Sequence, residues 1–139
     1  MGVKNWEAPF PVTFAAGPNA ALLTLPDVGL FTADADCEIL SVTERHETLG
    51  TDGGAVTADI KKAPSGTAIA GGTSLLASTF NLKAAINTTQ SRSRAAGTLA
   101  ADRVILAGQC VGVDFTGTMT AVTGVCITVM LRRLREPSY

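Results

Sequence analysis

The segment CVGVDFTGTMTAVTGVCITVML, residues 110–131, determines the predicted fold of this chain. Apolar side chains alternate with others on both sides of a turn at Gly117, as expected of two β-strands that each bury one face. The inward positions are Val111, Val113 and Phe115 before the turn, and Val125, Ile127, Val129 and Leu131 after it. The last strand is also apolar at Met130, which is typical of a strand in the middle of a sheet or against another subunit.

Strand-like segments with the same alternation recur about every ten residues along the rest of the chain. They are VTFAA (12–16), CEILSVTERHET (37–48), AVTADIKK (55–62) and TFNLKAA (79–85). The Asp-Gly of LGTDGG (49–54) predicts a tight hairpin, and TSLLAST (73–79) predicts one helical turn. Helical periodicity is otherwise almost absent. The pattern therefore predicts an all-β fold, an antiparallel β-sandwich of jelly-roll type with about eight strands.

The length of 139 residues fits a single domain that can bury its own core. Pro9 and Pro11 flank Phe10 and keep this part of the backbone out of a helix, so we expect residues 1–9 to form an extended N-terminal arm. The sandwich domain is then expected over residues 10–139. We expect neither a secretory leader nor a membrane span, because no apolar run is long enough for either.

Charged residues make up only 17% of the chain, against a typical quarter, and the formal net charge is −1. A surface with so few charges indicates that a partner covers part of it, although a sandwich with a threonine-rich exterior would also explain the composition. Nucleic acid is not an expected partner, since no overall field attracts phosphate. The basic exceptions are Ser91–Arg94 and the tail with Arg132, Arg133 and Arg135.

Residues that could carry chemistry are few. His46 is the only histidine, and its charged neighbours predict a solvent-exposed position at a strand end. Asp34, Asp36 and Glu38 alternate and could offer oxygen ligands to calcium, but the glycine and the distal glutamate of an EF-hand loop are missing, so a polar strand start is the preferred interpretation. The three cysteines, Cys37, Cys110 and Cys126, lack C-x-x-C spacing and predict free buried thiols, with one disulfide plus one thiol as the alternative. We expect no enzyme, no cofactor and no metal site.

Three runs of the sequence resemble a family of small virion proteins encoded beside the major capsid genes of tailed bacteriophages. The runs are TLGTDGGAVTADIKKAPSGTAIAGGTSLL (48–76), FNLKAAINT (80–88) and GTLAADRVILAGQCVGVDFTGTMTAVTGVCITVML (97–131). In these relatives a Gly-Thr-Asp turn precedes a Gly-Thr segment with paired leucines, and an Ala-Gly-Asp turn precedes the last hairpin. Gln109 stands here in place of that aspartate. The resemblance spans Cys37 to Leu131, about two thirds of the chain.

The resemblance implies a jelly-roll protein that forms a trimer and binds the outside of the phage head as a decoration or cement protein. Its partner would be the major capsid protein, and its location the virion exterior after assembly in the host cytoplasm. The family carries no residue-level site. From composition, we expect the arm, the last strand and the basic tail to make capsid or subunit contacts, through Trp6, Phe10, Met130, Arg132, Arg133 and Arg135.

Another virion component remains the alternative prediction. A tail, baseplate or head-fibre protein could use the same fold and contact a receptor or a glycan through the polar loop expected at Asn87–Gly97. The chain has only one tyrosine and one tryptophan with which to stack on sugars, which weakens this alternative. An enzyme of the cupin type would need several metal-binding histidines, and the chain has one.

Overall fold

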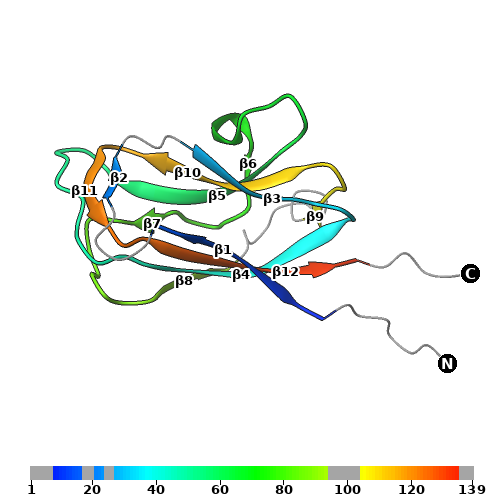
Figure 1. Cartoon of the computed structure of the whole chain (residues 1–139), viewed down its shortest axis with the longest axis horizontal. Helices are drawn as coiled ribbons and strands as arrows, with labels where there is room; N and C mark the ends of the chain where they lie inside the picture. Colours follow the sequence, from blue (N-terminus) through cyan, green and yellow to red (C-terminus); the bar gives the residue numbers. More distant parts are fainter. Residues whose placement is uncertain (1–7, 17–20, 24–26, 94–103, 135–139) are drawn as a thin grey trace, which may run out of the picture.

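The computed structural model describes residues 8–16, 21–23, 27–93 and 104–134 of the chain (Figure 1). These residues form twelve strands and one 3-10 turn. The elements are β1 (Phe10–Ala15), β2 (Ala21–Leu23), β3 (Asp27–Thr32), β4 (Cys37–Arg45), β5 (Thr57–Ala63), η1 (Ile69–Gly71), β6 (Thr73–Ser74), β7 (Phe80–Asn81), β8 (Gln90–Ser93), β9 (Val104–Ile105), β10 (Cys110–Thr116), β11 (Met119–Thr123) and β12 (Cys126–Arg133).

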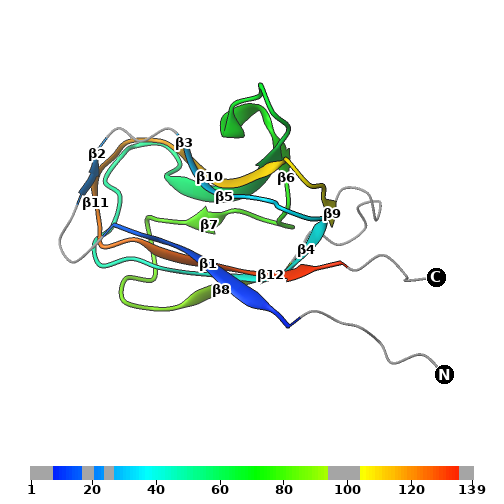
Figure 2. The same ribbon diagram turned by 45° about the vertical axis from the view of Figure 1, so that its right-hand side comes forward.

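Two antiparallel sheets pack face to face (Figures 1 and 2). The first has the order β1-β12-β4-β8, with β9 also beside β4, and the second has the order β3-β10-β5-β6, with β7 also beside β5. A short β2–β11 pair lies at one end. Consecutive strands mostly change sheets, so neighbours within a sheet are distant in sequence. This is the jelly-roll arrangement, with eight principal strand positions, and the predicted fold class is confirmed.

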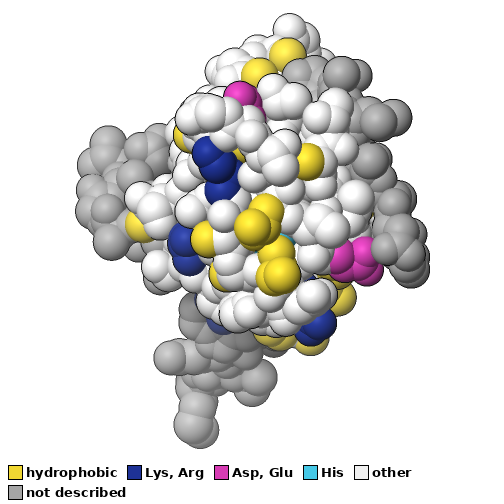
Figure 3. All heavy atoms as spheres, turned by 90° about the vertical axis from the view of Figure 1, so that its left-hand side faces the viewer, with side chains coloured by type: hydrophobic (Ala, Val, Ile, Leu, Met, Phe, Trp, Pro, Cys, Tyr) yellow, Lys and Arg dark blue, Asp and Glu magenta, His cyan; other side chains and the backbone are white. Residues whose placement is uncertain are grey.

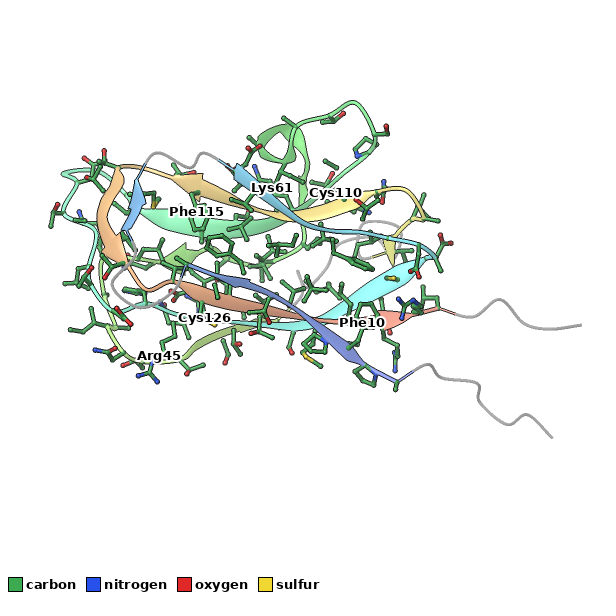
Figure 4. The ribbon with its side chains drawn as sticks, in the orientation of Figure 1. Phe10, Arg45, Lys61, Cys110, Phe115 and Cys126 are labelled. Carbon is green, nitrogen blue, oxygen red and sulfur yellow. The ribbon has the colours of Figure 1, made fainter. Side chains whose placement is uncertain are left out.

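The predicted inward faces of the last two long strands are confirmed. β10 and β12 are both central in their sheets, and all seven side chains predicted to point inward are buried. Phe115 points from β10 into the space between the sheets (Figure 4). β12 lies between β1 and β4. Its two apolar faces are therefore explained by a place in the middle of a sheet, one of the two explanations given above.

The predicted hairpin at residues 49–54 is wrong. β4 and β5 belong to different sheets, and residues 46–56 connect them across one end of the sandwich. β4 and β5 each have one apolar face. Both faces are buried because the two strands lie in opposite sheets rather than side by side. The Asp52 side chain holds this connection, accepting from the backbone N–H of Thr118 at 3.0 Å, while Gly50 N–H donates to the Leu82 carbonyl.

Two further predictions of local structure are wrong. Thr73–Ser74 is strand β6, paired with Lys61–Lys62, and the one helical turn is η1 at residues 69–71. Strand pairing is favoured over a helical turn there, because the backbone N–H of Leu75 also donates to the Ile60 carbonyl. Within the predicted loop 87–97, Gln90–Ser93 forms β8 against β4, although it has no apolar alternation.

Candidate interaction surfaces

One lateral side of the sandwich, which we call the closed side, is formed by β8 and β9 of the first sheet and β6 and β7 of the second. Polar side chains link the two sheets along it. Gln90 donates to the Asn81 carbonyl at 3.0 Å, and the Arg92 guanidinium lies 5.1 Å from the centre of the Phe80 ring. Lys62 donates from Nζ to a carbonyl of β9 at 2.7 Å. The chain thus covers its own core here, and Phe80 is completely buried.

His46 lies at this side of the core and is completely buried, so its predicted exposure is wrong. Its Nδ1 is 2.8 Å from Glu44 Oε1, and Glu44 Oε2 accepts from Gln90 at 2.8 Å. Burial raises the pKa of Glu44, and these hydrogen bonds oppose the rise. The alternation of β4 continues through Val42, Glu44 and His46, so the strand's inward face determines the position of these polar residues.

The opposite lateral side, which we call the open side, is formed by the edge strands β1 and β3. All the partly buried hydrophobic residues that pack against the core, among those described, lie in or directly after these two strands: Phe10, Val12, Phe14, Ala16, Val28, Leu30 and Phe31. The Phe10 and Phe31 rings meet edge to face with their centres 5.5 Å apart. The core is therefore only partly covered along this side.

β1 begins and β12 ends at the same end of the sandwich, where the register places Phe10 opposite Leu131 (Figure 1). Arg133 lies over Phe10, with its guanidinium carbon 4.4 Å from the ring centre, and it bonds Asp34 at 3.0 Å. This bond lowers the pKa of Asp34. Arg132 pairs with Glu38. Two of the predicted contact residues, Phe10 and Arg133, therefore form one corner at the end of the open side; Figure 4 labels Phe10 there.

Of the other predicted contact residues, the structure describes Met130 and Arg132. Met130 points outward from β12 and is half-buried, opposite Pro11 on one side and Ser41 on the other. Trp6 and Arg135 lie outside the described residues. Arg132 and Arg133 do not present a basic patch, because each carries an acidic partner.

The acidic residues that could have bound calcium make other contacts instead. Asp34 and Glu38 pair with the two arginines, and Asp36 accepts from the backbone N–H of Ala107 at 2.9 Å. No three His, Cys, Asp or Glu side chains of the described residues form a group that could hold a metal. Cys37, Cys110 and Cys126 are all free, as predicted, but only Cys37 is buried; Cys110 is half-buried and Cys126 is exposed, so their predicted burial is wrong for Cys126.

The end of the sandwich opposite the start of β1 and the end of β12 carries a small apolar patch. The loops that follow β4 and β7 contribute Leu49 and Ile86, which are 40% and 46% exposed. Figure 3 shows hydrophobic side chains gathered near the middle of this end, among few charged ones. Helices that could cross a membrane do not occur in the described part of the chain.

The fold has counterparts among solved structures. A chain of the cyanophage Pam1 capsid asymmetric unit matches 96% of this chain and 91% of its own length, with a TM-score of 0.55 and 11% identity. A chain of infectious bursal disease virus, Gx strain, matches 96% of this chain but only 36% of its own, with a TM-score of 0.43 and 11% identity. No protein-family model matches the chain, and no curated protein matches its sequence. The first likeness, at this identity, shows a shared fold.

Sequence reasoning did not identify β3 as part of a candidate surface. Its two adjacent bulky residues, Leu30 and Phe31, were a usable signal, because a regular strand cannot turn both toward the core. In the structure, the pairing of β3 with β10 shifts at Leu30, and both side chains remain partly buried at the edge.

Proposed function

We propose that this chain is a structural virion protein that binds the outside of a tailed-phage capsid as a trimeric decoration or cement protein and stabilises the shell. The observation that carries the proposal is the match to a chain of the cyanophage Pam1 capsid asymmetric unit over nearly the full length of both chains. The sequence resemblance to small phage virion proteins supports the same function independently of the fold.

The proposed mechanism is mechanical. A protein that binds neighbouring subunits of an assembled shell, but not the loose subunits, stabilises the assembled state by mass action. Once one of three linked copies is bound to the shell, the effective concentration of the other two at their own sites is high. A modest affinity at each site is therefore enough for stable attachment. This role needs no catalytic residues and no cofactor. The virion exterior, after assembly in the host cytoplasm, is the proposed location, and the major capsid protein is the proposed partner.

The proposed attachment region is the arm, residues 1–9, together with the corner at Phe10 and Arg133. The corner supports this because the arm leads directly into β1 there, at the end where β12 also stops. Trp6 and Arg135 would extend the same contact from the two termini, while the sandwich of residues 10–139 would fold independently of it.

The copy number of this chain in purified particles, relative to the major shell subunit, tests the proposal. Quantitative gel densitometry of intact heads gives this ratio directly. A ratio comparable with that of the shell subunit is the expected result, and particles stripped of the protein should then release their genome at a lower temperature. A few copies per particle would instead indicate the tail, baseplate or head-fibre role, and absence from particles would contradict a virion function altogether.

A further inference from the structure

We propose that the open side, β1 with β3, is the surface through which copies of this chain associate with one another. This inference rests on the self-association in the proposed function and adds to it the residues that make the contact. Three independent features of the open side support it: its partly covered apolar side chains, its unpaired backbone, and its lack of charge.

Hydrophobic side chains that pack on the core are only partly buried on the open side. Among the described residues, the partly buried hydrophobics in contact with the core all belong to β1, β3 and the residue after β1. Three of them are phenylalanines: Phe10, Phe14 and Phe31. Aromatic side chains that are half-covered in the monomer gain the most from burial in an interface, and they are enriched at the centres of such interfaces.

The backbone of β1 has a free edge whose groups can be assigned from the register. Ala16 N–H donates to the Val125 carbonyl, and the β1–β12 pairing continues this register without a shift. In an antiparallel pair, the residues that bond to the partner strand alternate with residues whose N–H and C=O point away. Val12 and Phe14 therefore bond to β12, while the N–H groups of Thr13 and Ala15 point away from the sheet.

These two N–H groups make no hydrogen bond within the described part of the chain. Pro11, the next residue on the same edge, has no N–H to leave unsatisfied. An exposed edge of this kind readily pairs with another chain unless charged residues protect it. β1, with the sequence FPVTFA, contains no charged residue at all.

The absence of charge favours a second copy over a different partner. In a symmetric assembly the same patch approaches the symmetry axis from every subunit, so a charge in it would face its own copy and repel it. β3 has one charged residue, Asp27, and its carboxylate accepts from the backbone N–H of Ala70 at 3.1 Å. Arg133 and Asp34, at the end of the open side, pair with each other.

A pair of matched substitutions tests the assignment. Leu30→Lys places a charge on the open side at a partly buried position. Leu49→Lys makes the same chemical change at the 40% exposed position in the end patch. Light scattering after size exclusion should show an oligomer of 14.3 kDa chains for the wild type and for Leu49→Lys, and monomers for Leu30→Lys. Circular dichroism and thermal melting are the control: a folded Leu30→Lys protein should keep the β-sheet spectrum and a cooperative melt.

Hydrogen exchange gives a second test, whose first part uses the wild type alone. In the wild-type oligomer the amides of Val12, Thr13, Phe14 and Ala15 should all exchange slowly. In the Leu30→Lys monomer, Thr13 and Ala15 should exchange at least tenfold faster than Val12 and Phe14, which keep their bonds to β12.

Some results would overturn the inference. A Leu30→Lys protein that assembles like the wild type, or a wild type that stays monomeric at micromolar concentration, would do so, as would fast exchange at Thr13 in the oligomer. A wild-type dimer that Leu30→Lys dissociates would support the surface while contradicting the trimer. Shell binding by the wild type is measured separately, so failure of the decoration role and failure of this interface remain distinguishable.

Discussion

The two lateral sides of the sandwich cover the edges of the hydrophobic core in different ways. On the closed side, polar side chains from one sheet bond to the other sheet, and the residues beneath them, such as Phe80 and His46, are completely buried. On the open side, β1 and β3 meet through half-exposed apolar side chains, with the Phe10–Phe31 contact at one end. The chain thus covers its own core on the closed side, whereas the open side is only partly covered and its two strands carry one charged residue, Asp27.

The largest expected difference between the two sides is in the cost of removing a phenylalanine. Phe80→Ala on the closed side should lower the free energy of unfolding by about 3–5 kcal/mol, because a completely buried ring leaves a cavity. Phe14→Ala on the open side should cost clearly less when both are measured in the monomeric Leu30→Lys background by urea denaturation. Equal costs would mean that the two sides are equally closed.

The next largest effect is expected on removing the buried carboxyl group of Glu44, on the closed side. Glu44→Ala leaves the buried His46 Nδ1 without its partner and removes one of the two acceptors of Gln90, and we expect a loss of about 1–3 kcal/mol in the free energy of unfolding. Its neighbour Arg45 is exposed and points away from the core (Figure 4). Arg45→Ala is therefore the control and should stay within about 0.5 kcal/mol of the wild type. A Glu44→Ala protein as stable as this control would show that the buried pair adds nothing.

The same carboxyl predicts a dependence of stability on pH. Burial raises the pKa of Glu44 above its ordinary 4.5, so the folded state holds the proton more tightly than the unfolded state. The stability of the wild type relative to Glu44→Gln should then be greatest below pH 4.5 and fall as the pH rises through the raised value. Denaturation curves of both proteins between pH 4 and 7 measure this difference. A relative stability that rises with pH would reverse the assignment.

The smallest effect is expected at the corner that ends the open side. Arg133→Gln removes the bond that lowers the pKa of Asp34, so this pKa should return toward 3.8. Carboxyl carbon chemical shifts followed by NMR report it directly. Because both partners are well exposed, the melting temperature should hardly change. An unchanged Asp34 pKa would mean that the pair does not persist in solution.

The sequence predicted the fold class because inward and outward positions alternate locally along each strand, as in β10 and β12. It could not predict which strands pair. LGTDGG has the residues of a hairpin turn, yet β4 and β5 lie in different sheets because each needs an apolar face opposite its own. β8 forms because β4 offers it a backbone edge, which its own residues do not reveal.

The contact residues were only partly predictable for the same reason. Arg132 and Arg133 looked like a free basic tail, but their acidic partners Glu38 and Asp34 lie more than 90 residues earlier in the chain. The exposure of His46 was judged from its charged neighbours, although the alternation of β4 already placed it inward. Local alternation was the better guide in that case.

The pairing of Phe10 with Leu131 also has a consequence for how the protein is made. β1 is synthesised before the other strands of the fold, whereas its partner β12 is synthesised after all of them. The first sheet therefore cannot be completed before every other strand has been made, and closing so long a loop makes folding slow. During that interval the uncharged β1 is exposed on both edges, so the nascent chain should depend on chaperones, and on a low local concentration of its own copies, to avoid premature association.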